Sequence, residues 1–194
     1  MKRSACFAFA VVGTVAAQAQ TFTNVSFNTT VSGASAIFTP AGNTYTANIT
    51  GFTLGPASVG DIAWIFNFNS SPVPAYNAVT IEIRGTIQGG SLDIIGNEKV
   101  FDTSFAPPIE VVNGTINGNF VGGAQPTPFT LTQTFNFSQP VTTGQAQKDI
   151  LHITSASGTA TINSIKQSFA PVPEPATIAA IGVGLAALAR RRKR

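Results

Sequence analysis

Cysteine, histidine and charged residues are scarce in this chain. Of its 194 residues, one is cysteine, one is histidine and 10% are charged. Cys6 lies close to the N-terminus, so the remainder of the chain cannot form a disulfide framework. A zinc site at the single histidine, His152, would have to rely on carboxylates, which is unusual. The stretch between residues 20 and 170 also lacks the helical spacing of apolar residues, which excludes a helical bundle.

The first 19 residues have the organisation of a secretory signal peptide. Residues 1–3 (MKR) are a short basic region, and residues 4–17 are apolar or small. Residues 17–19 (AQA) fit the small-x-small rule for signal cleavage, which predicts a mature chain that begins at Gln20. Cys6 falls within this segment, where we expect it to be hydrophobic filler.

The last stretch, residues 171–194, combines three features in a fixed order. A triplet of Pro173, Glu174 and Pro175 precedes an uncharged run over residues 176–189, and five consecutive cations follow: Arg190, Arg191, Arg192, Lys193 and Arg194. As a helix this 14-residue run spans roughly 21 Å, less than the core of a bilayer, which is about 30 Å thick. We expect a short transmembrane helix that is held briefly, with the cations on the cytoplasmic side. The prolines keep the triplet extended and accessible to a processing enzyme.

With all three features present, residues 171–194 resemble the PEP-CTERM sorting signal of Gram-negative bacteria. The resemblance implies recognition and cleavage at or near the triplet by exosortase, a membrane-embedded cysteine transpeptidase. It also implies export to the cell envelope or to an extracellular polysaccharide matrix, after transient anchoring in the inner membrane. The alternative is a plain C-terminal anchor with a chance Pro-Glu-Pro before it. Residues 20–170 resemble no family.

The basic residues are concentrated at the two ends. With residues 1–19 and 190–194 set aside, four basic residues remain against eight acidic ones, a net charge of −4. The sequence pI of about 9.4 therefore describes the targeting segments. A domain that binds nucleic acid needs a basic face, so we predict no nucleic-acid partner.

Between the ends, residues 20–170 alternate apolar and polar side chains with a period of two, which is typical of β-strands. The clearest ladders are Tyr45, Ala47 and Ile49; Ile62, Trp64, Phe66 and Phe68; Val79, Ile81 and Ile83; and Phe129, Leu131, Phe135 and Phe137. Turn signals such as Gly96-Asn97 separate the strands. About nine to twelve short strands predict an all-β domain, either an antiparallel sandwich or a closed barrel. We favour a sandwich of jelly-roll or Greek-key type, and its strand order stays open.

His152 is the obvious candidate for catalysis, because it is the only histidine in the chain. It alternates with Leu151 and Ile153, which predicts a solvated position on the opposite face of a strand. No nucleophile elbow accompanies it for a Ser-His-Asp arrangement. We therefore predict no catalytic residue and a protein that is not an enzyme.

Acidic residues suggest two further sites. Asp93, Asn97, Glu98 and Asp102 surround the predicted turn, and such oxygen ligands suit Ca²⁺. Their spacing fits neither an EF-hand nor a calcium β-roll, so we predict no cofactor and keep calcium as the alternative. A pair of carboxylates across a cleft could also hydrolyse glycosides.

Carbohydrate binding would require an exposed aromatic platform. Trp64 lies in register with apolar neighbours, which predicts a core position. Tyr76 is predicted to lie in the proline-rich loop after Ser70 and is the better candidate for an exposed platform. The preferred hypothesis is a non-enzymatic structural or adhesive protein of the surface or matrix. The alternatives are a carbohydrate-binding module that acts on exported polysaccharide and, third, a secreted hydrolase.

Overall fold

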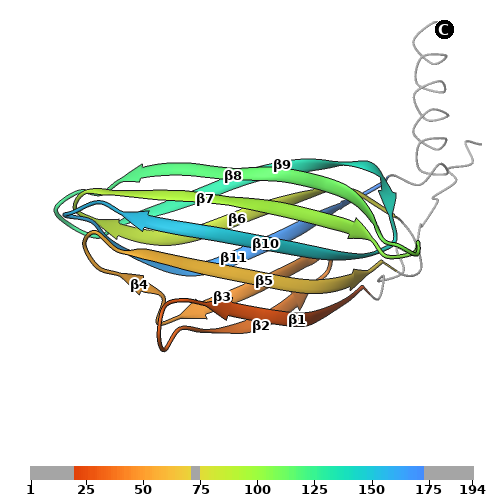
Figure 1. Ribbon diagram of the computed structural model, residues 1–194, viewed down its shortest axis with the longest axis horizontal. Coiled ribbons are helices and arrows are strands. Elements are labelled where there is room, and N and C mark those ends of the chain that lie inside the picture. Colours follow the sequence, from red (N-terminus) through yellow and green to blue (C-terminus); the bar gives the residue numbers. More distant parts are fainter. Residues whose placement is uncertain (1–19, 71–74, 173–194) are drawn as a thin grey trace, which may run out of the picture.

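The computed structural model describes residues 20–70 and 75–172, which form two antiparallel sheets packed face to face (Figure 1). Every regular element in these residues is a strand. The strands are β1 (Thr21–Thr29), β2 (Ser35–Ala41), β3 (Thr44–Thr50), β4 (Thr53–Leu54), β5 (Val59–Asn69), β6 (Tyr76–Gln88), β7 (Ser91–Asp102), β8 (Ile109–Val121), β9 (Thr127–Val141), β10 (Thr143–Thr154) and β11 (Thr159–Pro171). The predicted antiparallel sandwich is confirmed.

The strand order, which the sequence left open, is that of a jelly roll. The first sheet has the order β1-β5-β10-β7-β8, and the second has the order β2-β3-β11-β6-β9, with β4 paired to β11. Without β1, β2 and β4, two four-stranded sheets remain, β5-β10-β7-β8 and β3-β11-β6-β9. The last two strands insert between strands formed much earlier in the chain, as expected for the paired Greek keys of a jelly roll.

The core lies between the sheets and is built from the predicted ladders. Ile62, Trp64, Phe66 and Phe68 point inward from β5, and the first three are fully buried. Successive side chains of a strand point to opposite faces, so one apolar set in each strand is enough to cover the inner face. The aromatic rings touch one another; those of Trp64 and Phe66, for example, lie 4.7 Å apart. Aromatic burial of this kind stabilises a domain that has no disulfides.

The predicted turn at Gly96-Asn97 is wrong, because β7 runs straight through both residues. Gly96 is required by close strand packing: a Cβ there would lie 2.4 Å from the backbone oxygen of Asp149 on β10. Gly114 in β8 has a similar role, since a Cβ there would lie 2.3 Å from the ring of Phe135. Glycine in a strand therefore marks close approach here, and β7 is one long strand where a turn was predicted to separate two.

Candidate functional site

The candidate sorting motif begins where the sandwich ends. β11 continues to Pro171, which pairs with Tyr76, and the N–H of Val172 donates to the backbone oxygen of Ala75 at 2.8 Å. Residues 170 and 171 therefore belong to β11. At the same end of the sandwich, β1 begins with Thr21 paired to Asn69. The predicted signal peptide and the C-terminal stretch thus join the body at the same end.

The targeting residues themselves lie outside the described part of the chain. This holds for the predicted signal peptide (1–19), the apolar run (176–189), the triplet Pro173, Glu174 and Pro175, and the cations Arg190, Arg191, Arg192, Lys193 and Arg194. Within residues 20–70 and 75–172, no helix is long and apolar enough to cross a membrane.

His152 lies on the inner face of β10, so the prediction of a solvated position is wrong. It does alternate with Leu151 and Ile153, but those two residues form the outer face, and His152 is fully buried. Its ring packs edge-on against Phe52 at 5.1 Å. Burial lowers the pKa of His152 to about 4, against a smaller opposing effect of the backbone at Gly60 and Ile150. No described side chain hydrogen-bonds to it, so it lacks the partner and the solvent access that general-base catalysis requires.

The two aromatic residues considered for carbohydrate binding are both in the core. Trp64 is fully buried as predicted, and its indole N–H donates to Asn24 Oδ1 at 2.9 Å. Tyr76 is also fully buried, which overturns its prediction as an exposed platform. It is the first residue of β6, and its ring packs against those of Phe68 and Phe169 at 5.8 and 4.9 Å.

The four oxygen-bearing residues of the calcium hypothesis do not converge. Because they belong to one continuous strand, Asp93 and Asn97 point outward, whereas Glu98 and Asp102 point inward and are buried. Asp93 accepts a hydrogen bond from Asn119 at 2.5 Å, and Asp102 accepts one from the Ser104 hydroxyl at 2.6 Å. Among the described residues, no group of three or more His, Cys, Asp or Glu side chains could hold a metal ion.

A pair of carboxyl groups, Asp61 and Asp149, lies on the outer face of the first sheet. The pair comes from β5 and β10, and neither residue stands out in the sequence. Partial burial, followed by hydrogen bonding to Asp149 and repulsion from it, raises the pKa of Asp61 to about 6. The two residues are diagonal neighbours on adjacent strands, since Leu151 pairs with Asp61 and Asp149 pairs with Ala63.

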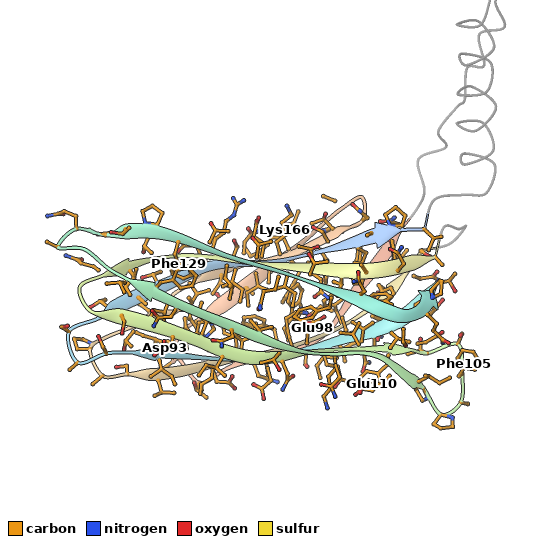
Figure 2. All side chains as sticks on the ribbon, turned by 90° about the horizontal axis from the view of Figure 1, so that it is seen from above. Asp93, Glu98, Phe105, Glu110, Phe129 and Lys166 are labelled. Carbon is orange, nitrogen blue, oxygen red and sulfur yellow. The ribbon has the colours of Figure 1, made fainter. Side chains whose placement is uncertain are left out.

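Three polar side chains meet inside the core: Glu98 from β7, Lys148 from β10 and Gln167 from β11 (Figure 2 labels Glu98 between the sheets). Lys148 Nζ lies 3.5 Å from Glu98 Oε2, and Gln167 Nε2 donates to Glu98 Oε1 at 2.6 Å. Burial raises the pKa of Glu98 to about 7, partly offset by Lys148, and it lowers the pKa of Lys148. Alternation places Lys148 on the same face of β10 as Ala146 and Ile150, and this pattern could have predicted its buried position.

An open groove lies on the outer face of the first sheet, next to the connection between β7 and β8. It has a volume of about 310 Å³ and is lined by Phe101, Thr103, Pro108, Gln145 and Gln147. The amides form a chain, in which Gln147 donates to Gln145 at 2.6 Å and Gln145 donates to Asn67 at 3.0 Å. The lining thus combines an aromatic ring and a proline with neutral hydrogen-bonding groups. The sequence did not suggest it, since two stretches that are distant in the chain, 101–108 and 145–147, build it.

Several solved structures have a similar architecture. TmCBM61 in complex with β-1,4-galactotriose is 8% identical with a TM-score of 0.37, over 79% of this chain and 90% of that one. The CBM22-1 xylan-binding domain from Paenibacillus barcinonensis Xyn10C is 11% identical with a TM-score of 0.34, over 78% and 87%. The CBM36-1 domain of a multidomain xylanase from the hindgut metagenome of Trinervitermes trinervoides is 14% identical with a TM-score of 0.33, over 79% and 99%. At such scores the likeness carries no argument about ligand or activity.

The sequence comparisons identify the tail. A comparison with curated proteins gives no match. Residues 171–194 match the family model of the PEP-CTERM protein-sorting motif. The chain therefore carries a PEP-CTERM sorting motif directly after its β-sandwich body, which indicates an exported protein that is sorted to the cell surface.

Proposed function

We propose that this chain is a non-enzymatic structural or adhesive protein of the cell envelope or extracellular matrix, delivered there by exosortase. The observation that carries the proposal is the match of residues 171–194 to the sorting motif. In support, His152 is fully buried and has no hydrogen-bonding side chain among the described residues. In this proposal the β-sandwich performs the structural or adhesive role, and the C-terminal sorting motif determines its location.

The processing steps follow from the order of the segments. Residues 1–19 direct export, and residues 176–189 hold the chain in the inner membrane with the cations of residues 190–194 on the cytoplasmic side. Exosortase then cleaves at or near Pro173, Glu174 and Pro175. β11 ends at Pro171, so a single residue, Val172, separates the folded strand from the triplet. The enzyme therefore works immediately beside the folded domain.

The test is a change of the triplet in the full-length chain. Pro173→Ala with Glu174→Ala removes the fixed φ and the carboxylate, and we expect the protein to stay uncleaved and membrane-retained. Pro126→Ala with Glu110→Ala is the matched control, since it changes the same residue types at exposed positions of the body. Mass spectrometry of the exported form gives the C-terminus. A released protein that still ends at Arg194 would contradict the proposal.

The groove supports a second candidate function, binding of a neutral polysaccharide. Sugar rings stack on aromatic faces and exchange hydrogen bonds with amides, and Phe101, Gln145 and Gln147 offer both. The lining has no charged residue, which favours an uncharged ligand. A volume of about 310 Å³ is at the lower end of ordinary ligand pockets.

Affinity electrophoresis of the protein in gels that contain soluble β-1,4-xylan or β-1,4-galactan tests this candidate. We expect retardation that Phe101→Ala reduces at least about fivefold, because loss of one stacking ring costs on the order of 1 kcal/mol or more. Phe105→Ala is the control, since Phe105 is 49% exposed near the groove and does not line it. Equal retardation of the two variants would place binding elsewhere, and no retardation in any gel would leave the structural role alone.

A further inference from the structure

The cluster of Glu98, Lys148 and Gln167 has the arrangement of a reactive centre. Lys148 and Glu98 are direct cross-strand partners on the inner face of the first sheet. Gln167 reaches the same carboxyl group from β11 in the opposite sheet. One oxygen of Glu98 faces the lysine amine, and the other accepts from the glutamine amide nitrogen. An amine and a carboxamide are thus brought together by one carboxyl group, away from water.

As a purely non-covalent cluster, this arrangement is poorly satisfied. Lys148 Nζ, Glu98 Oε2 and Gln167 Oε1 are buried and have no hydrogen-bond partner among the described residues. The 3.5 Å between Nζ and Oε2 exceeds the range of about 2.7 to 3.2 Å for hydrogen bonds to oxygen. Lys148 Nζ lies instead 4.5 Å from the ring centre of Trp64 and 4.7 Å from that of Phe66. Buried polar groups without partners are costly, and a buried ion pair is stabilising only when its geometry is good.

The apolar surroundings favour the uncharged forms that amide chemistry needs. Burial lowers the pKa of Lys148, which favours the neutral, nucleophilic amine. Burial also raises the pKa of Glu98 to about 7, so that its carboxyl group can both accept and release a proton near neutral pH. Both groups are positioned by the same carboxyl group, at 3.5 Å for Lys148 Nζ and 2.6 Å for Gln167 Nε2, and such positioning favours reaction between them.

We propose that Lys148 and Gln167 join in an intramolecular isopeptide bond, with Glu98 as the proton relay. Lys148 Nζ attacks Gln167 Cδ, and a new C–N bond forms there. The bond from Cδ to Nε2 breaks, and Nε2 leaves as ammonia. Glu98 takes one proton from Nζ, gives one to Nε2 and ends in its starting protonation state. One secondary amide and one ammonia are produced, with no oxidant or reductant.

The bond would connect the two sheets covalently through their interior strands. β10 lies between β5 and β7, and β11 lies between β3 and β6, so the cross-link joins an interior strand of each sheet. The body has no cysteine with which to form a disulfide across this core. A covalent amide gives an exported protein the same kind of constraint without thiol chemistry. The inference concerns the body alone and does not depend on how the tail is sorted.

Peptide mapping of the full-length chain, purified and then denatured, tests the cross-link. A lysine-specific protease should cut after Lys99 and Lys166 but not after an acylated Lys148. We expect residues 100–166 to remain attached to the peptide that begins at Gln167, with a total mass lower by one ammonia. Free peptides that end at Lys148 and begin at Gln167, from protein that was folded before denaturation, would overturn the proposal. A loss of one water, with Lys148 joined to Glu98, would overturn the assigned acceptor.

Variants separate the chemistry from the fold. Lys148→Met and Glu98→Gln should both give uncross-linked protein, the first for lack of a nucleophile and the second for lack of a proton relay. Lys99→Arg changes an exposed lysine in the neighbouring strand and should leave the cross-link complete. The near-ultraviolet circular dichroism of Trp64, which contacts Lys148, reports whether each variant is folded. Full cross-linking in Glu98→Gln would refute the role of Glu98.

Discussion

Burial of a neutral histidine makes the stability of this protein depend on pH in a predictable direction. His152 titrates with a pKa of about 4 in the folded chain and 6.5 when exposed. The unfolded chain therefore binds the extra proton first as the pH falls, and folding loses stability between about pH 6.5 and pH 4. Since one pKa unit corresponds to about 1.4 kcal/mol, the loss is about 3 kcal/mol by pH 4. That is a large fraction of the roughly 5 to 15 kcal/mol by which domains are stable.

The measurement compares wild type with His152→Leu, in which an apolar side chain of similar size that cannot titrate replaces the imidazole. Urea unfolding followed by the fluorescence of Trp64, the only tryptophan, gives the free energy of unfolding at each pH. We expect the difference between the two proteins to shift by about 3 kcal/mol in favour of the variant from pH 7 to pH 4. Ile162→Leu, a core change in the other sheet, should keep the wild-type dependence.

The stability of the variant has to be subtracted from that of wild type, because two acidic residues change stability with pH in the opposite direction. The pKa values of Asp61 and Glu98 are raised in the folded chain, to about 6 and about 7. Their folded forms hold protons that the unfolded chain has released, so they add stability as the pH falls. His152→Leu leaves both in place. Parallel stability curves for wild type and variant between pH 7 and pH 4 would refute the assignment of His152 as a buried neutral group.

Two further predictions concern residues whose roles changed once the structure was known. Gly96→Ala should lower the free energy of unfolding by about 1 to 3 kcal/mol, because its Cβ would lie 2.4 Å from the Asp149 backbone oxygen. Urea titration measures the loss, and an unchanged midpoint would contradict the close packing of β7 on β10. Tyr76→Ala should lower the free energy of unfolding by about 3 to 5 kcal/mol, because a buried ring is lost. Tyr76→Phe should lower it far less, since the phenol oxygen has no partner among the described residues. Equal losses in the two variants would mean that the hydroxyl group is important for stability.

Periodicity identified most strands and which residues share a face. The ladder from Ile62 to Phe68 and the one from Val79 to Ile83 lie on the inner face as predicted. The face opposite the second ladder is polar, and the face opposite the first carries only Ala63 and Ile65 as apolar residues, so burial of the ladder removes the most apolar surface from water. The sorting motif could also be recognised from the sequence, since a linear signal needs no fold to be read.

Errors arose where a local signal had two physical causes. Glycine marks both turns and close packing, and at Gly96 the neighbouring strand decided between them. A tyrosine after a proline-rich segment can lie in the loop or begin the next strand, and Tyr76 begins β6. In both cases the deciding contacts come from residues distant in the sequence. The calcium hypothesis failed for the same reason, since it depended on a turn at Gly96.

By itself, the sequence determined the sorting motif, the all-β class and which residues share a face in most strands, because these follow from a linear signal, from composition and from a period of two residues. Only the tertiary structure decided which face of a strand is inside when both faces carry apolar residues. In β10 the inner set is Ile150 and His152, and the outer set is Leu151 and Ile153. Which set is buried depends on which face of the strand packs against the other sheet. The contact of Lys148 and Gln167 with Glu98 depends on the same packing. No local pattern contains that information, because it is set by contacts between strands that the chain brings together only on folding.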